Sequence, residues 1–490
     1  MSKPVRVIII VGLILALVAV IVFRSQISRD ATALAAYKAG LRAKGEKLTA
    51  EEFGFPRPPE TSQNLALLIA GLNQLPKAQF DPAELELMEF VSAGRAEVIW
   101  ARPQVRRNST QGLPKGYRTV QSEWEDFTAQ FETAAAALQN IRDATQIPPR
   151  YFFNDPANFT NSPKGPFMQM RLAGQWLMGD AVAALRAHQL DRAMTNLHAL
   201  TQLAQFYRED LDLVSQRMRT VTAGMGLVTT WEALQASGWT EAQLEGLQKD
   251  WEAVDLENVF ELALLADRAF GEVYFAYLRA LPPQERAAAF RFGLATGPIS
   301  AEGFVNQLVG MSLWAANSEN DEACYLRHLQ ASLDAYRQLR QGAPWPVVSQ
   351  RLGTIMADLE AVNQNFMTRY RHLVSATIHS KYVWVGSSCV RSETQRRLTI
   401  TALALERFRL RHGKYPPELA ALVPQFLSAV PIDLMSAKPL RYRLNADGTF
   451  TLYSVGEDGR DDGGDPSLAS AANKFGLWEG KDAVWPTAVK

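Results

Sequence analysis

The side chains that most often carry catalysis are spread along this chain and do not form a motif. His372 and His379 are seven residues apart, on one face of a helix, but no neighbouring Cys, Asp or Glu completes a metal-binding set. The segment Gly40–Lys47 has the glycine spacing of a phosphate-binding loop, yet Glu46 stands where that loop needs lysine. No H-E-x-x-H or G-x-S-x-G motif occurs. The sequence therefore predicts no catalytic or cofactor-binding residues, and an enzyme would have to assemble its site from distant residues.

Carboxylates are concentrated on a glycine-rich stretch near the C-terminus. This acidic cluster comprises Asp458, Asp461, Asp462 and Asp465, with Asp482 later in the chain. Without a cation between them, these carboxylates would repel one another. The same residues also fit an ordinary solvated acidic loop, so the spacing leaves both interpretations open.

The elements that must position this cluster are a helix and a small antiparallel sheet. From Ser392 the apolar residues recur at helical spacing until Gly413, a residue type suited to the left-handed position that ends a helix. Alternating apolar residues then predict strands over 440–444 and 450–452, joined by a tight turn. Residues 392–490 are therefore predicted to form a small C-terminal α+β domain.

At these residues the chain resembles the globular domain of the major pseudopilin of type II secretion systems. The resemblance rests on several short motifs that occur in the family's order. They are Ala404–Arg409, Gly413–Pro416, Val430–Asp433, Lys438–Tyr442 and Leu452–Gly459. The whole chain also resembles uncharacterised bacterial membrane-anchored helical proteins that carry this tail, a likeness that implies no activity.

The pseudopilin resemblance implies a structural calcium ion, because pseudopilins of this type bind one in the loop after the last strand. The ligands implied here are the five aspartates of the acidic cluster, since calcium takes six to eight oxygen ligands. The chain departs from the family at residues 434–436, which replace its P-W-G, and no prepilin cleavage site occurs before residue 7. The resemblance therefore does not imply processing or polymerisation as a pilin.

The middle of the chain has helical periodicity. Residues 168–207 predict two antiparallel helices with a break near residue 189, a hairpin that resembles one tetratricopeptide unit. No recurrence at about 34 residues follows, so a true repeat array is not predicted. We predict a helical body over residues 119–391, preceded by a separate helical region over residues 25–118.

Composition marks the loops between these helices. Proline or glycine clusters predict loops over residues 102–118, 147–166 and 386–388, and residues 121–143 between the first two predict a single helix. The first loop has five basic residues and no acidic one. It is interpreted as a solvated connector, and contact with anionic lipid or an acidic partner is the alternative.

An uncharged apolar stretch, Val7–Phe23, predicts a transmembrane anchor within residues 1–24. Arg6 and Arg24 flank it and can extend the span to the membrane interfaces. A cleaved signal peptide is the alternative, but the run is long and no small-x-small site follows. A short tail before a large domain favours an amino end inside the cell. We therefore predict a bacterial inner membrane protein whose partner through residues 7–23 is membrane lipid and whose body is periplasmic.

Composition narrows the function classes. Lys plus Arg and Asp plus Glu each number 51, and the resulting zero net charge argues against a nucleic-acid-binding protein. Two cysteines, Cys324 and Cys389, exclude a disulfide scaffold, although the two could pair.

The sequence predicts a non-enzymatic single-pass envelope protein. It would be a helical scaffold with a pseudopilin-like interaction module, linked to a type II secretion or pilus-like system through an unknown envelope partner. The alternative is a membrane-anchored extracytoplasmic hydrolase with its active site in the helical body.

Overall fold

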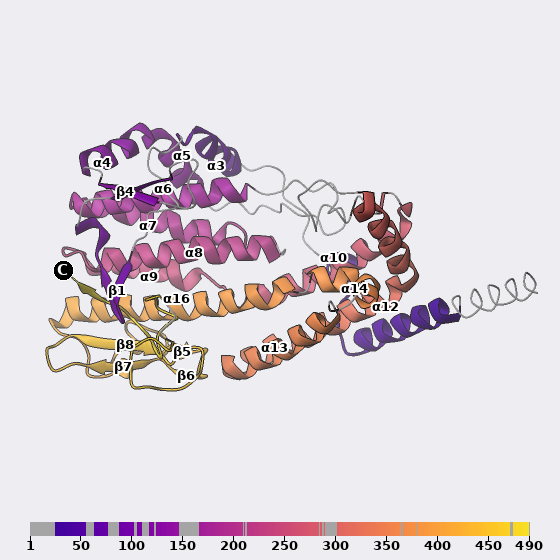
Figure 1. Ribbon diagram of the computed structural model, residues 1–490. Coiled ribbons are helices and arrows are strands. Elements are labelled where there is room, and N and C mark those ends of the chain that lie inside the picture. The colour runs from indigo at the N-terminus through magenta and orange to yellow at the C-terminus, as the bar shows by residue number, and fades with distance from the viewer. Residues whose placement is uncertain are drawn as a thin grey trace, which may run out of the picture. The chain divides into compact units, whose positions relative to one another are not determined.

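The computed structural model is mainly helical, as predicted, with short strands in two parts of the chain (Figure 1). The predicted anchor Val7–Phe23 and the proline-rich residues 147–165 lie outside the part that the structure describes. Within that part, no helix combines the length and the apolar character needed to cross a membrane. The structure describes residues 25–54, 63–76, 88–101, 105–109, 117–121, 124–146, 166–208, 210, 213–283, 285–286, 289, 301–362, 364, 366–378, 380–470 and 474–489.

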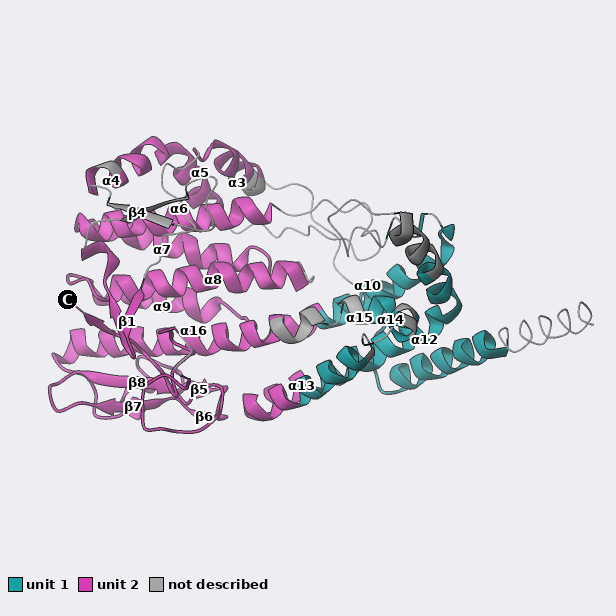
Figure 2. Cartoon of the chain, in the orientation of Figure 1, with its two compact units in different colours: residues 1–56, 264–335, 351–384 teal, residues 57–263, 336–350, 385–490 magenta. Residues whose placement is uncertain are grey.

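The chain divides into two compact units (Figure 2). Unit 1 comprises residues 1–56, 264–335 and 351–384, and unit 2 comprises residues 57–263, 336–350 and 385–490. Each unit combines segments that are distant in the sequence. The linear ranges predicted above divide the chain in another way and stay predictions.

Unit 2 begins with short strands and a series of helices. In chain order these are α3 (Gln63–Gln74), β1 (Glu89–Ser92), β2 (Arg95–Glu97), η2 (Ile99–Ala101), β3 (Val105–Ser109), β4 (Tyr117–Gln121), α4 (Trp124–Thr133), α5 (Ala135–Gln146), α6 (Phe167–Arg186), α7 (Leu190–Gln205), α8 (Leu213–Leu234) and α9 (Glu241–Ala253). Its C-terminal part contains η3 (Leu419–Leu422), β5 (Ile432–Asp433), β6 (Lys438–Pro439), β7 (Arg441–Leu444), β8 (Phe450–Ser454), β9 (Ala483–Val484) and β10 (Thr487–Val489).

The remaining helices include all those of unit 1. Residues 25–43 are helical, and α2 (Ala50–Phe53), α14 (Phe366–Arg371) and α15 (Leu373–Ile378) belong to unit 1. Four longer helices contribute residues to each unit: α10 (Asn258–Ala280), α12 (Ala301–Arg340), α13 (Trp345–Val362) and α16 (Ser380–His412).

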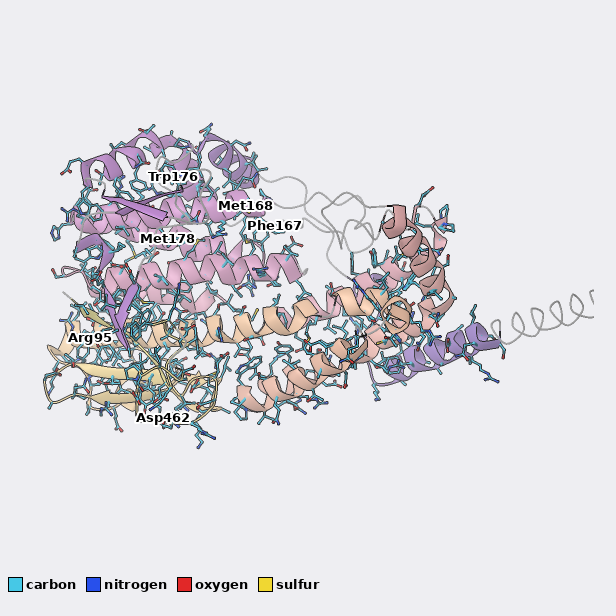
Figure 3. All side chains as sticks on the ribbon, viewed as in Figure 1. Arg95, Phe167, Met168, Trp176, Met178 and Asp462 are labelled. Carbon is cyan, nitrogen blue, oxygen red and sulfur yellow. The ribbon has the colours of Figure 1, made fainter. Side chains whose placement is uncertain are left out.

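The helices α6 and α7 form the antiparallel hairpin that the sequence predicts. His188 takes the left-handed conformation between them, with φ at 53°. Trp176 and Met178 of α6 are buried, and the Trp176 ring meets Phe131 of α4 edge to face at 5.6 Å (Figure 3). Large aromatic side chains bury much apolar surface, so these contacts anchor α4 on the hairpin.

A second core joins α9 to α16 and to the C-terminal sheet. Thr240 and Gln243 form a capping box at the start of α9, which fixes where that helix begins. Trp251 of α9, Leu398 of α16 and Leu452 of β8 are fully buried in one cluster. The helical body and the C-terminal elements therefore share a hydrophobic core.

Short strands complete unit 2. The strands β7, β8 and β9 form an antiparallel sheet, with Tyr442 opposite Leu452 in the predicted hairpin. The last strand, β10, leaves this sheet and pairs in parallel with β2, where Ala488 lies opposite Ala96. The Trp231 indole of α8 donates to the Pro486 carbonyl at 3.0 Å, just before β10. The C-terminal residues are thus bonded to β2, near the start of unit 2, and to α8.

Three local predictions are wrong. The helix predicted from Ser392 begins at Ser380, and the loop predicted at 386–388 lies inside it, because Gly386 is a close-packing position against Tyr336 and does not end the helix. Within the loop predicted at 102–118 and just after it, the backbone pairs as strands β3 and β4. The helix predicted over 121–143 is interrupted at Ala134.

Candidate functional site

The β8–β9 pairing places Asp482 beside the acidic loop. Asp482 immediately precedes β9, and the loop follows β8. The Asp482 carboxylate is almost fully buried and accepts backbone N–H groups from Gly464 at 2.8 Å, Asp465 at 3.0 Å and Asp462 at 3.4 Å. Burial raises the pKa of Asp482, and these three hydrogen bonds oppose that rise. The Asp482 side chain therefore organises the loop from within.

Two other aspartates of the cluster bind cationic side chains. Lys481 and the Ser467 backbone N–H and hydroxyl hold the Asp465 carboxylate, and their donated hydrogen bonds lower its pKa to about 2. Arg441 lies 2.8 Å from an Asp461 oxygen and lowers the pKa of that carboxyl, while the Tyr453 hydroxyl donates to the other oxygen at 2.9 Å. Protein donors therefore offset the charge of both residues.

The last two aspartates of the cluster are exposed. Asp458 accepts the Arg460 backbone N–H at 2.9 Å, and Asp462 faces solvent at the edge of the loop (Figure 3). Asp461, Asp465 and Asp482 thus each accept hydrogen bonds from the protein at both carboxylate oxygens. In the described part of the chain no group of three or more carboxylate, histidine or cysteine side chains is arranged to hold a metal ion. Protein donors therefore occupy three of the carboxylates that the resemblance assigns to calcium, and calcium binding at the cluster stays a prediction.

A second site, which the sequence does not predict, is a pocket in the helical body. It has a volume of about 420 Å³ and lies among residues of α5, α7 and α9, all in unit 2. The imidazole Nδ1 of His198 on α7 lies 2.8 Å from an Asp250 carboxylate oxygen on α9. Asp250 raises the pKa of His198 by accepting this hydrogen bond, while partial burial opposes the rise. A histidine held by a carboxylate in a pocket is a common functional arrangement.

The sequence missed this pair because its two residues lie on different helices, 52 positions apart. His198 is next to the buried Leu197, and Asp250 is next to the buried Trp251. When the apolar faces of two helices such as α7 and α9 pack together, the polar residues that border these faces meet at the edge of the interface. That neighbourhood is the sequence signal that could have found the pair.

Comparisons with known proteins add no assignment to either site. The chain matches no known protein family, no curated protein and no solved structure.

Proposed function

We propose that this protein is a non-enzymatic, single-pass envelope protein. Residues 7–23 would hold it in membrane lipid, and a helical body would present a pseudopilin-like module, residues 392–490, to an envelope protein partner. Its place would be the bacterial inner membrane with the body in the periplasm. A type II secretion or pilus-like system is the setting that the resemblance implies.

The observation that supports a scaffold is the shared core of the body and the C-terminal elements. Trp251 of α9, Leu398 of α16 and Leu452 of β8 pack in one cluster, and β10 is hydrogen-bonded to β2. A module attached at both of its ends does not move as a tethered domain. The body therefore fixes the orientation of whatever surface the module offers.

The surface best suited to a partner is the exposed part of the acidic loop. Asp458, Asp461 and Asp462 are exposed, but Asp461 is paired with Arg441, while Asp465 and Asp482 bind groups within the protein. Asp458 and Asp462 form no salt bridge within the described residues, and two such carboxylates favour a partner with a basic face and speed its encounter. We therefore place partner binding at this loop.

The experiment is crosslinked affinity purification of the full chain from bacterial membranes. A reporter at the C-terminus gives the side of the membrane. The double variant D458K/D462K reverses the two exposed charges, and D358K/E360K reverses two exposed charges of α13 as the matched control. We expect the first variant to lose the crosslinked partner and the control to retain it. A cytoplasmic reporter signal, or equal recovery from both variants, contradicts the proposal.

A second candidate function is the hydrolase, and the His198–Asp250 pair is the observation that favours it. A histidine held by a carboxylate can take a proton from an attacking water. No hydroxyl or thiol in the described residues is hydrogen-bonded to the His198 ring, so water itself would be the nucleophile. A panel of activated esters tests this candidate: H198Q should abolish turnover and H188N, in the turn before α7, should preserve it. Absence of turnover in the unaltered protein rejects the hydrolase.

A further inference from the structure

The pocket beside His198 is lined by both apolar and polar side chains. Its volume of about 420 Å³ falls within the range of small-molecule sites. Met194 and Leu247 contribute apolar surface, and Gln146, Thr195 and Gln243 contribute polar groups. A Cβ atom added at Gly246 would meet no atom within 4 Å, so the pocket is open above this position of α9.

The orientation of the His198 ring decides what the pocket offers. Nδ1 faces Asp250, an acceptor, and therefore carries a hydrogen in both protonation states of the ring. No described protein group is hydrogen-bonded to Nε2, and the ring is 32% exposed. When the ring is protonated, Nε2–H is a charge-assisted donor available to a ligand. When the ring is neutral, Nε2 is an acceptor.

Two of the other polar side chains of the pocket form hydrogen bonds elsewhere and leave the Nε2–H of His198 available. The Thr195 hydroxyl donates to the Asp191 carbonyl at 2.8 Å, and the Gln243 amide donates to the Asp191 carboxylate at 2.8 Å. Gln146 is exposed at the C-terminal end of α5. Its amide can donate a second hydrogen bond to a ligand oxygen.

We propose that this pocket binds a small aliphatic carboxylic acid. The ligand carboxylate accepts the Nε2–H of His198, and the aliphatic chain lies against Met194 and Leu247 over Gly246. This is a binding function separate from scaffolding, and it needs no turnover.

The proposal gives binding a definite pH dependence. The elements around His198 contribute Gln146 from α5, Met194 and Thr195 from α7, and Gln243 and Asp250 from α9. Asp250 is the carboxylate that contacts the ring, and Asp191 of α7 is the carboxylate that holds the Gln243 amide. Because Asp250 raises the pKa of His198, the ring stays charged to a higher pH than a free histidine. Below that pKa binding is at full strength. Above it the Nε2 lone pair faces the carboxylate, and the affinity falls about tenfold per pH unit.

The test is an NMR titration of the full chain, in zwitterionic detergent, with ¹³C-carboxylate-labelled hexanoate at pH 6 and at pH 8. We expect saturable binding at pH 6 and weaker binding at pH 8, with a smaller decrease than an unperturbed histidine would give, because the pKa of His198 is raised. H198Q should weaken binding at pH 6 at least tenfold, because it removes the charged donor. G246L should abolish binding by filling the pocket, and G353L, at another open helical glycine, should leave it unchanged.

Three results overturn the proposal. The first is no saturable binding of hexanoate to the unaltered protein. The second is equal binding to G246L and G353L, which would place the ligand elsewhere. The third is equal affinity for hexanamide, which would show that the carboxylate charge is not recognised.

Discussion

At the scale of single residues, buried charges hold this protein together, and Arg219 is the clearest case. The Arg219 side chain of α8 is fully buried, which lowers its pKa to about 10 and leaves it charged at neutral pH. It donates to the Ala204 carbonyl at 2.9 Å and to the Asp255 carbonyl at 2.8 Å. Ala204 belongs to the C-terminal end of α7, where backbone acceptors lack partners within the helix and a positive charge is favourable, and Asp255 lies two residues after the end of α9.

Replacing Arg219 with methionine should therefore destabilise unit 2. The variant R219M keeps the apolar stem but leaves buried carbonyls without donors, and we expect a loss of about 3 kcal/mol in the free energy of unfolding. Urea denaturation followed by circular dichroism measures it. The control R171M removes an exposed arginine of α6 and should change little. Equal stability of both variants would contradict the structural role of Arg219.

The acidic cluster gives a second prediction at this scale. Stabilisation by protein donors and binding of a calcium ion predict different effects of mutation. If protein donors stabilise the loop, D482N turns one of the two acceptor oxygens into an NH2 donor, leaves at least one of the three N–H groups without its acceptor and costs about 1–3 kcal/mol, while D462N costs nothing. Thermal unfolding should be the same in calcium and in chelator. If the family's calcium ion is bound, calcium raises the melting temperature and both variants reduce that rise.

At the scale of elements, a close contact between two helices can depend on a glycine that the local sequence pattern assigns to a loop. The glycine and serines at residues 386–388 predict a loop. In the structure Gly386 lies within α16, where a side chain would collide with the Tyr336 ring of α12. By contrast, the hairpin α6–α7, the α9 capping box and the β7–β8 turn follow from local signals and were predictable. Close approach between elements far apart in the chain leaves no such local signal, and the His198–Asp250 pocket was missed for the same reason.

The variant G386A tests this contact. Its added methyl group must push Tyr336 aside, and we expect unit 2 to lose about 1–3 kcal/mol from overpacking. The control G353A, at a helical glycine with open space around it, should stabilise α13 by up to about 1 kcal/mol. Melting temperatures of the two variants should therefore move in opposite directions. A shift of the same sign in both would contradict the close packing at Gly386.

The contact between α12 and α15 in unit 1 should depend on pH. Asp321 of α12 is fully buried and accepts hydrogen bonds from Trp314 and from the Val374 and Ser375 backbone. Burial raises the pKa of Asp321 from 3.8 to about 6, despite these bonds. Because the folded-state pKa is the higher one, its contribution to stability is complete below about pH 4 and is lost as the pH rises through about 6.

The comparison of D321N with the unaltered protein isolates this effect. Each unit of difference between the folded and unfolded pKa values corresponds to about 1.4 kcal/mol. Titration of Asp321 therefore changes the free energy of unfolding by about 3 kcal/mol in total. The asparagine variant does not titrate at this position, so the stability difference between the two proteins should narrow by about that amount between pH 3 and pH 7. Urea denaturation at several pH values measures it. A constant difference would contradict the raised pKa.

At the scale of the whole molecule, each compact unit is built from segments that are distant in the sequence, so linear domain boundaries do not match it. The sequence predicts residues 392–490 as a module, and their helix, hairpin and tight turn appear in the structure. However, α16 begins before residue 392, and Leu398 and Leu452 are buried against α9. The last strand, β10, finds its partner in β2. Local patterns predicted the elements, but a boundary drawn from them cuts through a shared core.

We therefore expect the isolated segment 392–490 not to fold. It would expose the face of α16 that packs on α9, and it would lack the partner of β10, so it would bury too little apolar surface to offset the entropy of ordering its chain. The ¹H–¹⁵N spectrum of the segment should show the narrow dispersion of an unfolded chain, with and without calcium. A matched measurement on the full chain should show cooperative unfolding of unit 2 that includes Trp231, whose indole is bonded to Pro486. A well-dispersed spectrum of the segment would instead show an autonomous pseudopilin-like domain, and it would weaken the argument that the body fixes the orientation of the module.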